Sequence, residues 1–350
     1  MVREYRGLAY RNNADLAAWL AKRPPEKALE PELPIIDPHH HLWHTEARGR
    51  YFLAELLADL GGGHNVVSTV FLECQAMFRA AGPEEMKPVG EIEFVVGQAA
   101  QMASGQYGKT RVCEGIIGWV DLLQGAKVRD VLEAEIAASG GRFRGVRYGT
   151  SWDEGLAGKF VSRAMTAHRL LDPKLREGFA VLGTMGLTFD SWHFHPQLPD
   201  LIDLARAFPG QTIIVDHVGG HLGIGQYAGK QAETLPIWKK NMQDLAGCPN
   251  VVVKLGGLGM TSFGFGFEYR ATPPSSQELA AAWKPYIETC IDLFGPERCM
   301  FESNFPPDKQ SCGYTELWNA FKIITKAASA AEKTALYSGT AARVYKMIAP

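Results

Sequence analysis

The chain has 350 residues, 46% of them hydrophobic and 21% charged, which is the composition of a globular protein with a large core. Its net charge of −2 argues against a surface that binds nucleic acid or an anionic membrane. No apolar run reaches the length of a membrane span, and residues 1–12 carry charges without the apolar core of a signal peptide. We therefore expect a cytoplasmic protein without nucleic-acid or membrane partners.

The six cysteines support the same compartment, because they are scattered along the chain and none shows Cys-x-x-Cys spacing. Most of them lie in or beside apolar runs, which is typical of buried, reduced thiols in a cytosolic protein. The cysteines are Cys74, Cys113, Cys248, Cys290, Cys299 and Cys312.

Residues 1–32 are interpreted as an N-terminal extension, with a short amphipathic stretch at 13–22 and a tether rich in proline and glutamate. From residue 33 to residue 350, short apolar runs typical of buried strands alternate with segments whose apolar residues recur at helical spacing. The expected strands are 34–41, 66–75, 112–121, 143–150, 179–189, 212–219, 251–258 and 299–305. The expected helices include 128–138, 198–207, 235–245 and 278–293, followed by 314–326 and 331–347 at the C-terminus.

Eight near-continuous apolar strands that alternate with helices predict a parallel sheet covered on both faces. Closing eight such units gives a (β/α)8 TIM barrel, an α/β fold. An open doubly wound sheet is the competing fold, but no Gly-x-Gly-x-x-Gly follows the first strand. We therefore predict one barrel over residues 33–350, with the two C-terminal helices on its wall or across its bottom.

Polar side chains gather at the ends of the predicted strands, where active sites form in a TIM barrel. Alternation along the first strand places His39 and His41 on the same side. One polar residue at a strand end carries little information. Nearly all of the predicted strands end in polar residues, and in a barrel these ends meet at one face, so together they predict a site there. The residues at these ends are His39, His41, Glu73, Trp119, Arg144, Arg147, Tyr148, Asp190, Trp192, His195, His217, Lys254, Glu302 and Asn304.

The fourth strand suggests the charge of the substrate. Alternation places Arg144 and Tyr148 on one side and Arg147 on the other, and an inward arginine suits bidentate binding of a carboxylate. Trp119 and Trp192 either wall a planar ligand or pack in the core. A small acidic substrate is the partner that these residues predict.

Three motifs resemble those of a known family: IIDPHHHLW near the start, then DHVGG, then FESNFPPD. In this order they are similar to the amidohydrolase-2 group of the amidohydrolase superfamily. The resemblance is strongest to the branch that contains 2-pyrone-4,6-dicarboxylate lactonase and sugar-acid lactonases. It implies a (β/α)8 barrel that hydrolyses a C–O or C–N bond, although other members of the superfamily decarboxylate unsaturated or aromatic acids.

The resemblance also implies roles for individual residues. His39 and His41 match the family's His-x-His, and His217 matches the histidine after the sixth strand. The histidine of the fifth strand is either His193 or His195, and the sequence HPQL favours His195. Asn304 stands where the family usually has an aspartate that binds a metal ion and accepts a proton.

An amide at position 304 is a poor metal ligand and cannot act as a base. Two readings follow: the protein works without a metal, or Glu302, two residues earlier on the same face, replaces the aspartate. Glu302 could equally be a supporting residue paired with Lys254 or an arginine. The cofactor is therefore none or one divalent ion, with zinc favoured. His39 and His41 are the expected metal ligands, with His195 or His217 as further candidates.

The resulting expectation is a lactonase that opens the lactone of a small carboxylic or sugar acid. The expected catalytic set is His39, His41, His217, Glu302 and Asn304, and the remaining strand-end residues are expected to bind substrate. A metal-dependent decarboxylase and an inactive ligand-binding barrel are the alternatives. A homodimer is the candidate assembly for this chain, because barrels of this type often dimerise.

Overall fold

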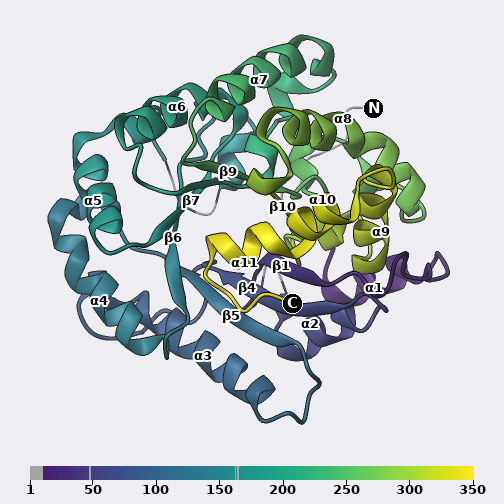
Figure 1. The fold of residues 1–350 in the computed structure, drawn as a ribbon, viewed down its shortest axis with the longest axis horizontal. Coiled ribbons are helices and arrows are strands. Elements are labelled where there is room, and N and C mark those ends of the chain that lie inside the picture. The colour runs from purple at the N-terminus through teal and green to yellow at the C-terminus, as the bar shows by residue number, and fades with distance from the viewer. Residues whose placement is uncertain (1–10, 47–48, 162, 164) are drawn as a thin grey trace.

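Parallel strands form a barrel at the centre of the molecule (Figure 1). The computed structural model describes residues 11–46, 49–161, 163 and 165–350, and within them the barrel sheet has 8 strands in the order β1-β4-β5-β6-β7-β8-β9-β10. Neighbouring strands of this sheet pair in parallel, which confirms the predicted barrel. The strands are β1 (Ile35–His40), β4 (Val66–Leu72), β5 (Arg111–Gly118), β6 (Phe143–Gly149), β7 (Thr188–Trp192), β8 (Ile213–Val215), β9 (Val251–Leu255) and β10 (Cys299–Phe301).

The barrel is closed by the residues that follow β10. His40 forms a parallel bridge with Phe305, the amide of His41 donates to Phe305 O (2.8 Å), and the amide of Asn304 donates to His39 O (2.9 Å). The end of the first strand and the segment after the last strand are thereby fixed side by side. This closure places the two most distant motifs of the sequence in one site.

Helices surround the barrel, as Figure 1 shows, and several begin at the residues that the sequence suggests. Ser275 caps α8, with its hydroxyl accepting from the amide of Glu278 and the Glu278 carboxylate accepting from the amide of Ser275. The barrel helices are α2 (Leu53–Leu60), α3 (Val89–Ala103), α4 (Val128–Ala138), α5 (Pro173–Thr184), α6 (Leu198–Ala207), α7 (Gln231–Ala246), α8 (Ser276–Phe294) and α9 (Tyr314–Ile324).

The prediction for the fifth strand, residues 179–189, was wrong in all but its last two residues. Residues 179–184 belong to α5, because Asp172 caps that helix and Pro173 occupies its first turn. The apolar residues of this stretch therefore form one face of a helix, and β7 begins only at Thr188. The sequence analysis also missed the hairpin of β2 (Trp43–Thr45) and β3 (Gly49–Tyr51) at the mouth of the barrel.

The C-terminal segment closes one end of the barrel, one of its two expected positions. Residues 331–347 form α10 (Ala330–Thr334), a π-helical turn (Ala335–Gly339) and α11 (Thr340–Val344). Figure 1 shows α11 lying across the barrel. Its apolar side chains, together with Tyr345, pack against inward residues of the strands such as Ile36, Ile214 and Met300. The interior on this side is consequently a packed core.

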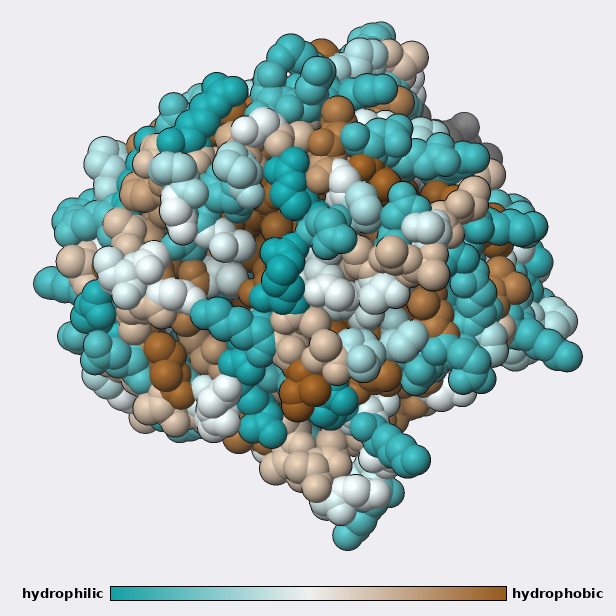
Figure 2. Space-filling model, viewed as in Figure 1, coloured by the Kyte–Doolittle hydropathy of each residue, from teal (hydrophilic) through white to brown (hydrophobic). Residues whose placement is uncertain are grey.

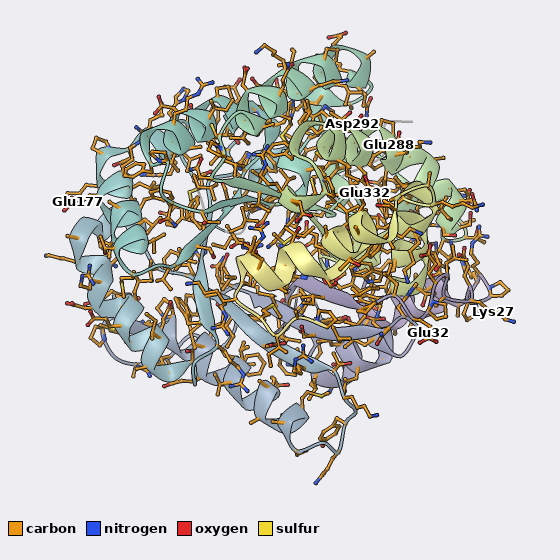
Figure 3. All side chains as sticks on the ribbon, in the orientation of Figure 1. Lys27, Glu32, Glu177, Glu288, Asp292 and Glu332 are labelled. Atoms are coloured by element: carbon orange, nitrogen blue, oxygen red, sulfur yellow. The ribbon has the colours of Figure 1, made fainter. Side chains whose placement is uncertain are left out.

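The described part of the N-terminal extension, from residue 11, contains α1 (Asn13–Leu20), and residues 1–10 of the predicted extension lie outside the described residues. Leu16 and Trp19 are the buried residues of this helix. The side chains labelled in Figure 3, such as Glu177 and Glu288, are exposed on the surface. Figure 2 shows hydrophilic residues over much of one face with smaller hydrophobic groups between them. None of the helices of the described chain combines the length and apolar character needed to cross a membrane.

Candidate active site

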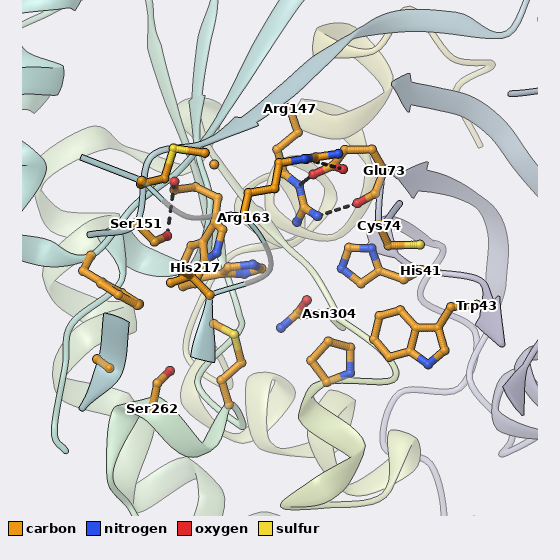
Figure 4. A pocket seen from close by; sticks show the side chains of 18 residues that line it. His41, Trp43, Glu73, Cys74, Arg147, Ser151, Arg163, His217, Ser262 and Asn304 are labelled. Atoms are coloured by element: carbon orange, nitrogen blue, oxygen red, sulfur yellow. Dashed lines mark hydrogen bonds and ion pairs between the residues drawn. The ribbon is translucent and has the colours of Figure 1, made fainter. Parts of the chain in front are cut away.

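A pocket opens where the strands of the barrel end (Figure 4). Its polar lining comes from six strands and the loops that follow them, and its apolar lining comes largely from the same loops. The polar side chains are His41, Glu73, Arg147, Ser151, Arg163, His217, Ser262 and Asn304, and the apolar ones include Trp43, Val161, Met165, Trp192, Phe194 and Met260.

The His-x-His pair stands at the end of the first strand, with His41 in the pocket lining and His39 fully buried outside it. His39 and His41 point the same way along β1, and their Nε2 atoms lie 3.2 Å apart. His41 is held by a hydrogen bond between Nδ1 and Leu72 O (2.9 Å), whereas His40 faces Thr69 Oγ1 (2.8 Å). Burial lowers the pKa of both His39 and His41 well below the usual value, so both imidazoles are neutral at neutral pH.

Glu302 lies behind two imidazoles and bridges them. Its Oε2 is 2.7 Å from Nδ1 of His39, and its Oε1 is 2.6 Å from Nδ1 of His217. The carboxylate is fully buried and is absent from the lining of the pocket described above. A carboxylate that accepts from Nδ1–H fixes the tautomer and the orientation of an imidazole. Glu302 therefore directs Nε2 as the reactive nitrogen of both rings.

His217 needs an unusual backbone and a close glycine. Its φ is +55°, and a Cβ on Gly257 would lie 2.4 Å from atoms of the His217 ring. A side chain at position 257 would thus displace the imidazole. The glycine-rich segment after β9 is in this way part of the support of His217.

A buried charged cluster lies beneath the pocket. Lys254 Nζ is 2.6 Å from Asp190 Oδ1, 3.1 Å from Asp216 Oδ1 and 3.2 Å from His39 Nδ1. Tyr345, which follows α11, donates to Asp190 Oδ1 (2.6 Å). Burial raises the pKa of Asp190 to about 6, although the ammonium of Lys254 opposes this shift. Asp190 and Lys254, expected to bind substrate, are both fully buried and lie outside the pocket lining.

Two arginines and one glutamate lie together in the wall of the pocket, as Figure 4 shows. Arg147 Nε donates to Glu73 Oε1 (3.0 Å), and Arg163 Nη1 donates to Glu73 Oε2 (3.2 Å). Arg147 Nη1 also lies 3.3 Å from His39 Nε2. The Nη2 atom of Arg163 is buried and has no hydrogen-bond partner within the described residues. This nitrogen can donate to an anionic or hydroxylated ligand.

Arg163 was missed by the sequence analysis because it lies in the loop after β6, where no strand pattern marks it. Its guanidinium stacks on Trp119, 3.8 Å from the ring centroid. Trp119 in turn stacks on Tyr148, so these two expected substrate-binding residues support Arg163 and do not line the pocket. Arg144 bonds to Gly141 O and Phe143 O at the start of its strand, away from the pocket.

Asn304 lines the pocket and is oriented by a second buried carboxyl group. Its Nδ2 donates to Asp308 Oδ1 (2.7 Å), and Asp308 Oδ2 accepts from the amide of Gly259 (2.8 Å). Asp308 lies four residues beyond Asn304 in FESNFPPD, a motif position that the sequence analysis quoted without using. The contact leaves the carbonyl oxygen of Asn304 available to the pocket.

The two histidines that follow β7 have different surroundings. His195 accepts from the amide of Leu222 (3.1 Å) and packs against His221 and Tyr227, outside the pocket lining. His193 is fully buried, and Asp216 opposes the burial that lowers its pKa to about 4. The charge of Asp216 therefore acts on the pKa of His193 and not on that of His195.

One group of described residues has the chemistry of a metal site: His39, Asp216 and His217, whose ligand atoms all lie within 4.8 Å of one another. Both imidazoles are neutral, which is the form that binds metals. Neither carboxylate oxygen of Asp216 has a hydrogen-bond donor within the described chain, although Lys254 pairs with one of them by charge. Two histidines and a carboxylate suit Zn²⁺ and leave a position open. The donor set therefore fits a divalent ion.

Comparisons with known proteins identify relatives of this chain. A family model described as amidohydrolase matches residues 36–347. An uncharacterized protein of Sinorhizobium fredii is 30% identical over 338 residues, which make up 90% of this chain and 99% of that protein. An L-fucono-1,5-lactonase of Burkholderia multivorans is 26% identical over 330 residues, 90% of this chain and 97% of the lactonase. A solved amidohydrolase of B. multivorans with bound zinc has the same fold, with a TM-score of 0.66, 22% identity and coverage of 90% and 99% of the two chains.

Proposed function

Because this chain belongs to the amidohydrolase family, we propose that it is a hydrolase that opens the lactone ring of a small carboxylic or sugar acid. The observation that carries the proposal is Glu302, which orients His39 and His217 beside two arginines at the end of the barrel. The similarity to a lactonase over nearly the whole of both chains supports the substrate class. Hydrolysis of an ester needs a base for water and a donor for the carbonyl oxygen, and this set supplies both.

In the proposed reaction His217 is the general base. Burial lowers the pKa of His217 to about 3, so the ring is neutral, and Glu302 engages Nδ1, which leaves Nε2 to accept a proton. Water attacks the lactone carbonyl carbon as this proton moves to Nε2. When the tetrahedral intermediate collapses, the ring C–O bond breaks and the proton passes to the leaving oxygen. The products are a hydroxyl group and a carboxylic acid on one open chain, and the acid releases its proton to solvent at neutral pH.

Arg147 can stabilise negative charge on the carbonyl oxygen, because its guanidinium lines the pocket and lies beside His39. His41 donates through Nδ1 to Leu72 O, so its Nε2 offers an acceptor to the pocket. Arg163 and Asn304 offer a donor and an acceptor, respectively, for other polar groups of the substrate. Trp192 and Trp43 provide flat apolar surfaces in the same pocket. A small cyclic molecule with a carbonyl and several oxygens fits this lining.

His39, Asp216 and His217 are the residues that would hold a divalent ion. Such an ion, when bound, polarises a carbonyl or lowers the pKa of water. His217 cannot ligate an ion through Nε2 and also accept a proton there. With the ion bound, Asp216 and His39 would be its other two ligands. A group other than His217 would then have to be the base.

The test is a panel of sugar lactones and dicarboxylate lactones, with acid release followed by a pH indicator, before and after treatment with a chelator. We expect at least one lactone to be opened at a rate well above that of spontaneous hydrolysis, with the rate lost in the Glu302→Gln variant. Release of carbon dioxide from an aromatic acid without any lactone opening would favour the decarboxylase instead. Binding of lactones without turnover would favour the inactive barrel.

A further inference from the structure

Residues 11–23 of the N-terminal extension donate a series of hydrogen bonds to the loop of residues 256–275, which joins β9 to α8. The side chains of this segment reach backbone carbonyls within one short stretch, residues 268–273. The segment lies outside residues 36–347, which match the family model. The bonds are Arg11 Nη2 to Glu268 O (2.6 Å), Trp19 Nε1 to Arg270 O (2.8 Å), Lys22 Nζ to Ala271 O (3.2 Å) and Arg23 Nε to Pro273 O (2.9 Å).

The same segment also holds two other parts of the pocket mouth. Arg11 exchanges two hydrogen bonds with Gln310 in the loop after β10, from its amide to Gln310 Oε1 (2.9 Å) and from Gln310 Nε2 to its carbonyl (3.2 Å). Asn13 Nδ2 donates to Arg50 O (2.6 Å) in the β2–β3 hairpin. All three segments contribute residues to the pocket: Trp43 from the hairpin, Met260 and Ser262 from the loop after β9, and Asn304 and Pro307 from the loop after β10.

The segment is itself well fixed. Asn12 caps α1 by accepting from the amide of Asp15 (2.9 Å), and Trp19 is 3% exposed. The guanidinium of Arg11 stacks on the ring of Trp19, 4.2 Å from its centroid. Side chains that are already ordered lose little further entropy on forming a hydrogen bond. A fixed donor array can therefore order the loop that it binds.

The loop needs such partners because of its composition. Positive φ angles occur at Gly257, Gly264 and Gly266, and only short helical turns interrupt the loop. Glycine gives the unfolded loop more conformational freedom than other residues do, so ordering this loop is costly. Backbone carbonyls without strand partners must also find donors elsewhere. Residues 11–23 supply several of these donors.

We propose that residues 11–23 are a clamp that holds the β9–α8 loop against the pocket and so sets substrate affinity. Through the loop, the clamp fixes Met260 and Ser262 in the pocket wall. Trp19 and Arg23 are positioning residues, because they reach the substrate only through the loop. The effect on affinity rests on the proposed function, whereas the effect on the order of the loop does not.

The test combines amide hydrogen exchange with steady-state kinetics in the full-length protein. Trp19→Phe removes the indole donor and keeps an aromatic ring, and Arg23→Met removes a guanidinium that is partly exposed. The matched control is Lys27→Ala, which removes an exposed cation of the extension that is not one of the four donors to the loop named above. In the double variant we expect amides of residues 260–273 to exchange roughly tenfold faster, with the exchange of β1 and β4 unchanged. The control should behave as wild type.

With a lactone that the wild type opens, the double variant should raise KM about fivefold or more and leave kcat within about twofold. Loop exchange equal to that of wild type in a folded double variant would overturn the clamp. A loss of kcat with unchanged KM would also overturn it. If the double variant does not fold, amide exchange of the loop and steady-state kinetics are measured on the Arg23→Met single variant, and the same outcomes apply. Failure of the wild type to open any lactone would reject the proposed function, and the exchange result would still test the clamp.

Discussion

Nδ1 of His217 lies 2.6 Å from Oε1 of Glu302, and the backbone amide of His217 donates to the same oxygen at 3.2 Å. The two residues are separated by 85 positions in the chain, and β8 and β10 bring them together on either side of β9. The other oxygen of the carboxylate reaches His39. One buried side chain thus sets the orientation of imidazoles from the first and sixth strands of the barrel.

The Glu302→Gln variant should lose catalysis while it keeps its fold. An amide offers one acceptor oxygen, so it cannot accept from the Nδ1–H groups of both His39 and His217, and at least one ring loses its orientation. We expect kcat to fall about 10²–10⁴-fold, the usual contribution of a positioned base. The control is Glu297→Gln, at an exposed position. Wild-type turnover in Glu302→Gln would remove this carboxylate from the mechanism.

Arg163→Met should weaken substrate binding more than it slows chemistry. Methionine keeps apolar contact with Trp119 but removes the donor Nη2, which is free to bind a ligand. We expect KM to rise about tenfold with kcat nearly unchanged, because one charge-assisted hydrogen bond contributes ~1.5 kcal/mol or more. Arg144→Met is the matched control, since that guanidinium lies outside the pocket. Equal effects of the two variants on KM would argue against a role for Arg163 in binding.

Titration with Zn²⁺ tests the metal site directly. We expect chelator-treated protein to bind the ion at the site of His39, Asp216 and His217, with heat measurable by calorimetry. Asp216→Asn removes the anionic ligand and should weaken binding at least roughly tenfold. Asp292→Asn, on the exposed face of α8, is the control. Binding of equal strength in Asp216→Asn would place the ion elsewhere.

Buried histidines should make the protein less stable in acid. His221 is 1% exposed, and burial lowers its pKa from 6.5 to about 4. Between these two values the unfolded chain binds a proton that the folded chain does not, so stability is fully present above pH 6.5 and falls as the pH drops toward 4. His221→Gln should reduce this slope by about 1.4 kcal/mol per pH unit, measured by urea unfolding at several pH values. An unchanged slope would show that His221 is not neutral in the fold.

Much of the fold could be predicted because the strands of a parallel barrel are buried on both faces and read as apolar runs. The helices at 128–138 and 198–207 have the predicted bounds. The start of the fifth strand could not be read in the same way, because Phe179 and Val181 face the core from a helix and are as apolar as strand residues. Several strands also end earlier than predicted, because the residues after them leave the extended conformation: φ is positive at Gln75, His217 and Asn304.

The sequence by itself determined which residues stand at the strand ends, because alternation and the rule for barrel active sites depend only on local order along the chain. His41, Arg147, His217 and Asn304 line the pocket as this reasoning implies. Only the tertiary structure decided which polar groups face a ligand and which support others: Lys254 and Glu302 are fully buried, and Arg163 comes from a loop. Pairing among buried charges depends on distances across the barrel, which no spacing along the chain records.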